Sequence, residues 1–371
     1  MSLALLPVDA GNAALFEAVP ARLHRTAPWW TPAPPGDERR RFDPRANPSL
    51  TGTAVARWVA VEGKTPVGRI AAFAPREPAE AGYFGFFEST DDTAVAGALF
   101  DRAAGWAGER GRSRMLGPIA VTPRDEIGLV VDGFDRPGTI LTPCHPPYYG
   151  RLLAAHGFRP VVRLRSYAWT PAVSDPGGVV RLDARVNNRG RLRVRALDAS
   201  RLESEAQLAA RVINAAFNGV WGFTLISPDE AAAEARDLRQ ILDPALCLFA
   251  EDGDGPVGVA LTVPDANWLL RRMGGRLFPF GWIRVLRWRR RIPWARFMVL
   301  AVLPGRRAGG AALRLVVETH YALVRRGYTY AELAQVFDDN WSVRRVIERF
   351  GCPVARRFAV YERGTGREPG A

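Results

Sequence analysis

The strongest constraint on the fold is that one order of predicted elements occurs twice along the 371 residues. Hydrophobic periodicity predicts a hairpin, a further strand, a helix, a strand, a short helix ending at a glycine, and a last strand. This order first spans 54–169 and recurs over 192–362. The two hairpin turns are similar, with Glu62-Gly63-Lys64-Thr65-Pro66 matching Asp252-Gly253-Asp254-Gly255-Pro256. The repeated order favours an internal duplication over chance.

Length and the repeat together predict two domains, since a domain typically takes about 150 residues. We expect an N-terminal domain over 1–170, a linker over 171–190 and a C-terminal domain over 191–371. The linker is predicted from its helix-breaking residues, which include Pro171 and the runs Asp175-Pro176-Gly177-Gly178 and Asn187-Asn188-Arg189-Gly190.

Composition excludes several classes of protein. The apolar runs are shorter than the roughly 18 residues of a membrane-spanning helix, and the first residues lack the basic start of a signal peptide. The three cysteines, Cys144, Cys247 and Cys352, form no C-x-x-C pair, so neither a disulfide framework nor a metal site is predicted. We expect a cytoplasmic protein with no transmembrane segment and no bound metal.

Positive charge is concentrated in the second half of the chain. The net charge is +13, with 20 basic and 17 acidic residues in 1–170 against 31 and 21 in 171–371. The stretch 266–317 holds 12 arginines and no carboxylate. Such a field favours a phosphate-bearing coenzyme, nucleic acid or an acidic carrier protein. Without a recognition helix or an RNA motif, no nucleic-acid partner is expected.

The most specific motif runs from Val302 to Leu313 and reads VLPGRRAGGAAL, between a predicted strand and a predicted helix. Small residues at a helix start allow backbone N–H groups to approach a phosphate, although an ordinary strand-to-helix turn has the same composition. In its setting the loop resembles the coenzyme A pyrophosphate loop of the GNAT superfamily of N-acyltransferases. That loop reads Gln/Arg-x-x-Gly-x-Gly/Ala, matched here by Arg307, Gly310 and Ala312.

The resemblance covers about 192–363 and implies an α+β fold of two GNAT-like domains, each a mixed, largely antiparallel central sheet flanked by helices. It implies acyl-CoA, such as acetyl-CoA, as a cosubstrate. The implied coenzyme-binding residues are Val299, Ala301, Leu303, Arg307, Ala308, Gly309, Gly310, Ala311, Ala312 and Asn340. One departure is that Ile347 stands seven residues after Asn340, where the family often has a tyrosine acid.

The first copy, 54–169, looks like a degenerate GNAT-like domain. Its corresponding loop carries Glu88, Asp91 and Asp92 instead of the phosphate motif. Carboxylates there would repel a pyrophosphate by about 1 kcal/mol or more per close pair, so no coenzyme is expected in this half. The whole chain resembles tandem GNAT-like bacterial proteins through Gly85-Phe86-Phe87-Glu88, 125–134 and Pro146-Pro147-Tyr148-Tyr149.

Candidate catalytic residues follow from the need for a base that deprotonates an attacking amine. The strand Met298 to Val302 offers no carboxylate, so Glu332 on the next strand is the first candidate, against the alternative of an ordinary strand carboxylate. In the first copy Asp125 and Glu126 are further candidates. With Glu88, Tyr148 and Tyr149 as substrate-binding residues, they would form an acidic, aromatic pocket for a cationic amine. The alternative is that Asp125 and Glu126 cap a turn while the tyrosines pack in a core.

The apolar and arginine-rich insertion 266–293 admits three interpretations: an acyl pocket, a basic surface for an acyl carrier protein or membrane, and packing between the two halves. The leading hypothesis is an N-acyltransferase that moves an acetyl or other acyl group from acyl-CoA to an amine of a small molecule. The alternatives are an acyl-carrier-protein-dependent N-acyltransferase and a non-catalytic binding module on a GNAT fold.

Overall fold

A computed structural model describes residues 2–366 except 35, 79, 173–176, 188–191, 275–287, 289, 290 and 306–309. The chain divides into two compact units. The first unit is Met1–Leu164 together with Arg356–Ala371, and the second unit is Arg165–Ala355. Each unit is described by itself.

The first unit is a mixed sheet with helices on both faces. Its strands are β1 (Leu3–Pro7), β2 (Ala54–Glu62), β3 (Thr65–Ala74), β4 (Ala81–Ser89), β5 (Arg114–Gly117), β6 (Leu129–Asp132), most of β13 (Val354–Gly364) and the start of β7 (Arg159–Trp169). Its helices are α1 (Ala13–His24), α2 (Asp37–Arg41), α3 (Thr93–Gly108) and α4 (Tyr149–Ala155). Strands β1 to β4 pair antiparallel in order, β4 pairs parallel with β5, and β5 pairs antiparallel with β13.

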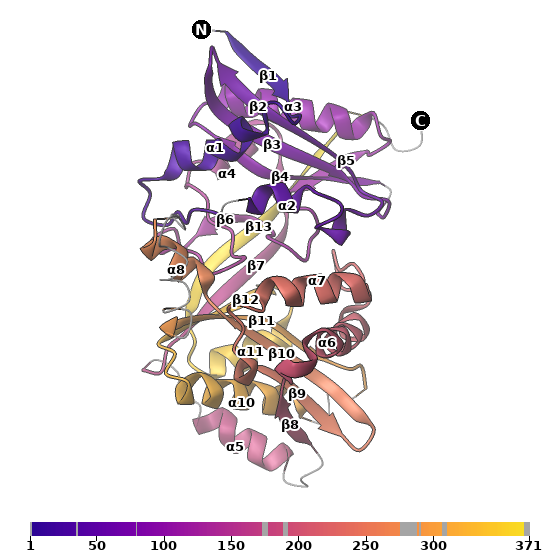
Figure 1. The fold of residues 1–371 in the computed structure, drawn as a ribbon, viewed down its shortest axis with the longest axis vertical. Helices are drawn as coiled ribbons and strands as arrows, with labels where there is room; N and C mark the ends of the chain where they lie inside the picture. Colours follow the sequence, from indigo (N-terminus) through magenta and orange to yellow (C-terminus); the bar gives the residue numbers. More distant parts are fainter. Residues whose placement is uncertain are drawn as a thin grey trace. The chain divides into compact units, whose positions relative to one another are not determined.

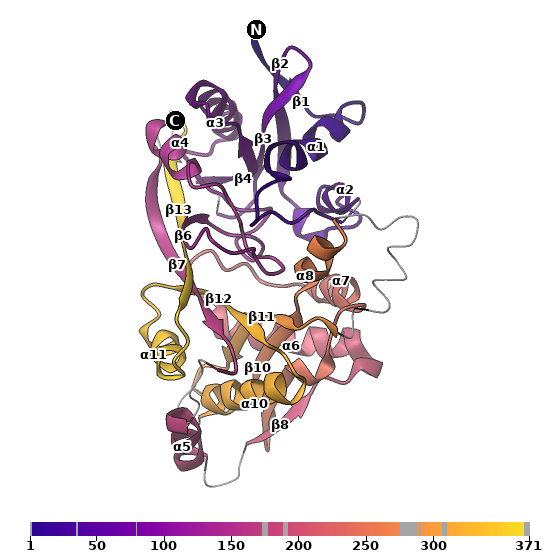
Figure 2. The ribbon, with the colours of Figure 1, turned by 90° about the vertical axis from the view of Figure 1, so that its left-hand side faces the viewer.

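The period-2 alternation of β3 explains why both faces of this sheet are covered. Ile70 and Ala72 join the cluster formed with α3, whereas the ring of Phe73 stacks on Phe42 at 6.2 Å on the opposite face. Figure 2 shows α3 and α1 on opposite sides of the strands. The β2–β3 hairpin turns at Gly63, whose φ of +62° is the left-handed conformation that glycine adopts most readily.

The second unit repeats this plan. Its strands are the end of β7, β8 (Arg193–Ala196), β9 (Cys247–Asp252), β10 (Gly255–Pro264), β11 (Trp294–Val302) and β12 (Tyr330–Phe337). Its helices are α5 (Gly177–Val186), α6 (Leu202–Phe217), α7 (Pro228–Leu238), α8 (Ala266–Arg272), α10 (Ala311–Arg325) and α11 (Trp341–Arg349), which are labelled in Figure 1. Strands β8 to β11 pair antiparallel in order, and β11 pairs parallel with β12.

The predicted fold class is confirmed, because each unit is a mixed, largely antiparallel sheet flanked by helices. The duplicated order is also visible. The elements β2, β3, β4, α3, β5 and α4 of the first unit correspond to β9, β10, β11, α10, β12 and α11 of the second. The hairpin strands, the crossover helix and the short helix therefore form as their periodicity predicts.

The strand that closes each copy is exchanged. β7 follows α4 in the chain, yet one of its two neighbours in the sheet order is β12 of the second unit. β13 follows α11, yet Tyr361 to Gly364 pair with Gly117 to Arg114 of β5, in the first unit. The expected boundary that placed all of 191–371 in one domain therefore differs from the structure, because periodicity shows that a strand exists but not which strand it pairs with.

Several elements were not predicted from the sequence. The expected linker 171–190 contains α5, which packs against α10 and α11, and β1, β6 and α7 were not recognised because they are short or polar. Of the insertion 266–293, the structure describes α8, the turn that follows it, Trp288 and 291–293. The predictions for the rest of this insertion lie outside the described residues.

Arg356 anchors the exchanged strand in the first unit, and its side chain is 1% exposed. It donates hydrogen bonds of 2.7 Å to the carbonyl oxygens of Arg136 and Pro137 and one of 3.3 Å to that of Gly133. A guanidinium group suits this place because it supplies several donors in one plane. The loop 133–137 is thereby held against the start of the last strand.

We expect Arg356→Met to lower the free energy of unfolding by about 3 kcal/mol, because it leaves buried carbonyl groups without donors. Urea denaturation followed by circular dichroism would measure this loss. Arg357→Met is the matched control, since Arg357 is exposed and lies 3.4 Å from an exposed Asp132, an arrangement that contributes at most about 1 kcal/mol. Equal losses in the two variants would contradict the role assigned to Arg356.

Candidate functional site

The central feature of the second unit is that β11 and β12 stop pairing before either strand ends. Their parallel register runs from Trp294 opposite Tyr330 to Phe297 opposite Leu333. β11 nevertheless continues to Val302, still paired with β10 on its other side, and β12 continues to Phe337. Beyond this point each strand has one edge without its former partner. The side chains from Phe297 to Leu300 and from Leu333 to Phe337 are correspondingly half-buried.

A β-bulge lies where the strands diverge. Phe297 is opposite Thr262 and Val299 is opposite Leu261, so Met298 is an extra residue in β11. β4 has a bulge at the corresponding place: Gly85 is opposite Ala71 while Glu88 is opposite Arg69. Bulges redirect a strand and its side chains and are frequent beside functional sites. Periodicity alone gave no signal for either bulge.

The direction of the backbone groups on β11 bears on the coenzyme contacts expected from this strand. The N–H of Leu303 donates to the carbonyl oxygen of Val257 at 2.9 Å, so it is already used within the sheet. Along an antiparallel strand, successive residues direct their backbone N–H and C=O groups to opposite sides. Val299 and Ala301 therefore also direct these backbone groups toward β10. The backbone groups that face the open edge are those of Leu300 and Val302. The backbone groups of Val299, Ala301 and Leu303 therefore point toward β10, and the expected contacts of these residues with a coenzyme stay a prediction.

The start of α10 lies directly after β11. Gly310 precedes the helix with a φ of +76°, and in the described part of the chain no side chain caps the first turn. A Cβ on Gly310 would lie 2.5 Å from a methyl of Val186, so this position requires glycine. The N–H groups of Ala311 and Ala312 belong to the helix end that carries partial positive charge. Arg307, Ala308 and Gly309 lie outside the described residues.

The corresponding helix of the first unit begins differently. The side chain of Asp92 accepts hydrogen bonds from the N–H groups of Ala94 and Val95, at 2.7 and 3.2 Å, and so caps α3 with a negative charge. The donors that could hold a phosphate are occupied, and the cap would repel one. The two copies thus differ at the helix start as the sequence indicated, with carboxylates at this place in the first copy and small residues in the second.

Asn340 directly precedes α11, and Ile347 lies within this helix. The side chain of Asn340 caps the helix by accepting a hydrogen bond from the N–H of Val343 at 3.3 Å. Its role toward a coenzyme stays a prediction. Ile347 is buried in the cluster that joins α11 to α10 and β12. The position that often holds a tyrosine acid in the GNAT superfamily is therefore a core position here.

Glu332 lies where β11 and β12 are still paired, one residue before the last pair. Its carboxylate is 1% exposed and accepts a 2.7 Å hydrogen bond from the hydroxyl of Ser166 on β7. Its register partner on β11 is Arg296, which is also buried. These contacts give Glu332 a structural role in joining neighbouring strands. Its role as a base stays a prediction.

In the first unit, a buried polar cluster surrounds Glu88 at the end of β4. One carboxylate oxygen lies 2.8 Å from Nε2 of His24 and accepts a 2.7 Å hydrogen bond from the hydroxyl of Tyr149. Arg69 lies 3.9 Å from the other oxygen and binds Glu38 at 2.7 Å. Burial alone would raise the pKa of Glu88, but the hydrogen bond to His24 and the charge of Arg69 together lower it. Burial and the nearby Glu88 hold the pKa of Tyr149 well above its ordinary value.

Tyr148 joins the same cluster. Its hydroxyl donates to the carbonyl oxygen of Ser89 at 2.8 Å, while the N–H of Ser89 donates to the hydroxyl of Tyr149 at 3.0 Å. Burial raises the pKa of Tyr148 to about 12. Both tyrosines are therefore neutral hydrogen-bonding groups at physiological pH. The structure brings Glu88, Tyr148 and Tyr149 together.

Asp125 and Glu126 are engaged elsewhere in this unit. Asp125 accepts hydrogen bonds from the N–H and hydroxyl of Thr122, at 3.0 and 2.9 Å, as in a capped turn. Glu126 pairs with Arg41 of α2 at 2.8 Å. Burial raises the pKa of Asp125, although the charge of Arg41 opposes the rise. These contacts favour the alternative in which Asp125 and Glu126 stabilise a turn over the alternative in which they line a pocket together with Glu88.

Sequence reasoning missed His24 and Arg69, which lie against the carboxylate of Glu88. His24 lies 64 positions before Glu88 in the chain, on a separate helix. Hydrophobic periodicity places α1 against the sheet, but it does not show which polar side chain of α1 meets β4. An arginine on an otherwise apolar strand, as Arg69 is on β3, was the available signal.

No family model matches the sequence. A curated relative, the bacterial ceramide synthase of Caulobacter vibrioides (strain NA1000 / CB15N), is 28% identical over 387 residues, covering 96% of this chain and all of the relative. Among solved structures, a tandem GNAT protein from the clavulanic acid biosynthesis pathway is similar over 99% of this chain and 100% of its own, with a TM-score of 0.59 and 14% identity. A GCN5-related N-acetyltransferase from Sphaerobacter thermophilus is similar over 98% and 96% of the two chains, with a TM-score of 0.57 and 14% identity.

The chain has a tandem GNAT-like fold. This fold supports acyl transfer in general, and in both copies the strand before the crossover helix is the one that carries the bulge. The described residues include no group of His, Cys, Asp and Glu that could hold a metal ion. Within the same residues, no helix is long and apolar enough to cross a membrane.

The polar cluster of the first GNAT-like unit leads to a pH-dependent stability. Because the folded pKa of Glu88 is lowered, its ionised form stabilises the protein above its ordinary pKa of 4.5, and this contribution is lost as the pH falls below that value. Between about pH 5 and about pH 3, we expect wild type to lose more free energy of unfolding than Glu88→Gln does. Denaturant titrations at each pH would measure the difference. Asp91→Asn, an exposed change three residues further along the chain, should behave like wild type. Parallel losses in wild type and Glu88→Gln would contradict the prediction.

Proposed function

We propose that the chain is an N-acyltransferase that uses acyl-CoA, with the coenzyme held by the second unit. The observation that carries the proposal is the open edge of β11 leading directly to the start of α10, which no described side chain caps. The backbone groups of Leu300 and Val302 suit the amide groups of a pantetheine arm. The N-terminus of α10, with Arg307 before it, suits a pyrophosphate. The residues present therefore fit the coenzyme.

An acyl thioester supplies an acyl carbon that a neutral amine can attack. The new C–N bond forms as the C–S bond breaks, and the proton of the amine passes to a base while the thiolate gains one. Glu332 remains our candidate for the base, since it lies one residue from the divergence of β11 and β12. Because Ile347 replaces the tyrosine acid, protonation of the thiolate would fall to water or to another group.

An apolar loop beside the open strands supports an apolar acceptor. The segment 218–227 joins α6 to α7, and on it Val220, Trp221 and Leu225 are 38%, 40% and 66% exposed. The ring of Trp221 lies 6.2 Å from that of Phe337, at the end of β12. Exposed apolar side chains grouped in this way are typical of ligand-binding surfaces.

The relative named a ceramide synthase favours the same substrate class. A ceramide is an amide of a fatty acid and a long-chain amino alcohol, so its formation is an N-acyl transfer. We propose that the acceptor of this chain is a long-chain amine and that the loop 218–227 receives part of its alkyl chain.

Calorimetric titration tests the coenzyme site first. We expect one coenzyme A per chain to bind at micromolar affinity, on the order of −8 kcal/mol, with acyl-CoA binding alike. Arg307→Glu should abolish binding because it places a negative charge beside the pyrophosphate. Glu332→Gln is the contrasting variant: it should bind coenzyme A as wild type does while its turnover falls. Absence of binding by wild type would overturn the proposal and leave a carrier-protein donor, while unchanged turnover in Glu332→Gln would remove Glu332 as the base.

The acceptor is tested with Trp221→Ala and Leu225→Ser. We expect each variant to raise the KM for sphinganine, a long-chain amino alcohol, by about tenfold, since each removes apolar area worth about 1.5 kcal/mol or more. Coenzyme affinity should not change. Val324→Ala, an exposed apolar residue of α10, is the matched control and should keep the wild-type KM. A uniform loss of kcat without a change in KM would place the two residues outside the acceptor site.

A further inference from the structure

The helix α5 presents a basic and apolar outer face that the proposed reaction does not use. Arg181, Leu182 and Arg185 are all exposed, with Leu182 at 38%. The acidic residue of this helix, Asp183, points inward instead, where it binds Arg314 at 3.2 Å and accepts a hydrogen bond from Asn187. The outer face of α5 is therefore positively charged and partly apolar.

The neighbouring helix α11 continues this character. Trp341, Arg345 and Arg349 are exposed and follow one another at intervals of four residues, with Trp341 60% exposed. At about 100° per residue this spacing keeps the three side chains within about 80° of the helix circumference. Figure 2 shows α5 and α11 beside each other at one edge of the second unit.

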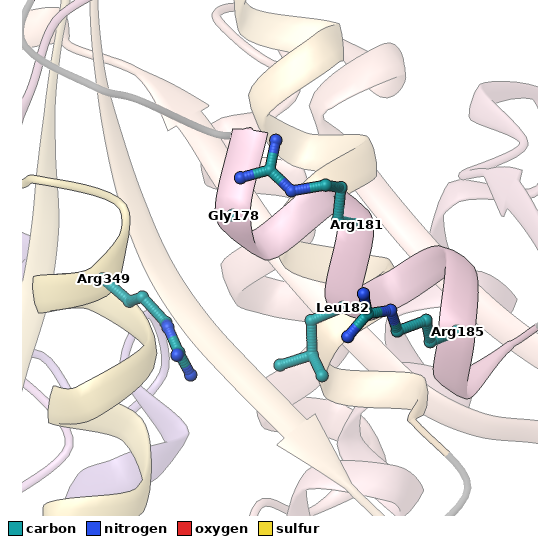
Figure 3. Close-up of a pocket in the computed structure, with 5 residues that line it drawn as sticks. All are labelled: Gly178, Arg181, Leu182, Arg185 and Arg349. Atoms are coloured by element: carbon teal, nitrogen blue, oxygen red, sulfur yellow. The ribbon is translucent and has the colours of Figure 1, made fainter.

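The two faces meet at a shallow pocket of about 230 Å³. Figure 3 shows Arg349 of α11 across this pocket from Leu182 and Arg185 of α5, with Arg181 one turn further along. The residues that line the pocket include no carboxylate. Nearby Glu348 accepts a hydrogen bond from the hydroxyl of Tyr167 and lies 3.5 Å from Arg344.

The four guanidinium groups of Arg181, Arg185, Arg345 and Arg349 have no carboxylate partner among the residues that the structure describes. Positive charges gathered without counter-charges repel one another and favour an anionic partner. A small phosphate compound would satisfy the charges, but it would leave Leu182 and Trp341 in water. A membrane surface accounts for both features, because anionic headgroups pair with arginine while apolar and indole side chains enter the interface.

We propose that the outer faces of α5 and α11, defined by Arg181, Leu182, Arg185, Trp341, Arg345 and Arg349, bind the surface of an anionic lipid membrane. This docking surface is distinct from the open edge of β11 and does not rest on the proposed transfer reaction. It lies within one unit, so it needs no particular arrangement of the two units.

Vesicle flotation of the full chain tests the proposal without any enzymatic readout. The probes are vesicles of phosphatidylcholine alone and vesicles that also contain phosphatidylglycerol. We expect binding to the second kind, weakened by salt, and little binding to the first. Each basic residue near an anionic surface favours binding by about fivefold, so Arg181→Gln/Arg185→Gln/Arg349→Gln should weaken binding by about a hundredfold. Leu182→Gln should weaken it at high salt as well, because the apolar contact is not screened.

The matched control is Arg193→Gln/Arg211→Gln/Arg239→Gln, which removes the same charge from exposed positions elsewhere in the second unit. It should retain most of the wild-type binding. Equal weakening by the two triple variants, equal binding to both kinds of vesicle, or no binding by wild type would each overturn the proposal.

Calorimetry with coenzyme A and with dephospho-coenzyme A distinguishes a soluble ligand from the membrane. The proposal predicts that the Arg181→Gln/Arg185→Gln/Arg349→Gln variant keeps wild-type affinity for both compounds. A selective loss of affinity for coenzyme A would instead assign the three arginines to its 3′-phosphate and overturn the docking surface. Failure of wild type to bind coenzyme A would count against the proposed function alone, because flotation does not depend on it.

Discussion

Hydrogen bonding between β11 and β12 ends after four residue pairs, and the proposed chemistry of the second unit depends on that ending. A parallel strand pair normally uses every backbone group along its length. Here the bulge at Met298 turns β11 away, so the backbone groups of Leu300 and Val302 face the open edge. The same strand then delivers the chain to the N-terminus of α10. A ligand with both amide groups and phosphates can therefore contact one continuous stretch of backbone.

The two copies of the fold have been modified in opposite directions. In the first copy the helix after the bulged strand is capped by Asp92, and Glu88 is enclosed by His24, Tyr149 and Arg69. A carboxylate that already has these hydrogen bonds and a nearby arginine gives an incoming cation little further attraction. In the second copy no described side chain caps the helix start, and Gly310 has no room for a side chain. The two copies differ at these few positions, while the sheets remain alike.

Hydrophobic periodicity and turn chemistry predicted the strands, the crossover helices and the duplication, because these are local properties of the sequence. The glycine-rich loop predicted a coenzyme site at the start of α10, and this stays a prediction. The sequence could not predict which backbone groups of β11 face the open edge. One bulged residue exchanges the backbone groups that face β10 with those that face the open edge. The partners of Glu88 were also hidden, because His24 reaches it from a helix that is remote in the chain. The helix α5 was not predicted either, because the glycines and prolines that flank it are typical of a linker.

The exchanged closing strand also affects how the protein is made. The first unit lacks β13 until 356–364 have been synthesised, and all 191 residues of the second unit precede that segment. At about 5–20 residues per second this is a delay of roughly 10–40 s. During that time the edge of β5 and the loop 133–137 have not yet met β13, which is their partner in the folded protein. Chaperones would bind the unpaired edge, or the edge would pair with a wrong strand, during this interval. The speed at which the second unit is translated, and with it the choice of synonymous codons there, can therefore influence the yield of the folded first unit.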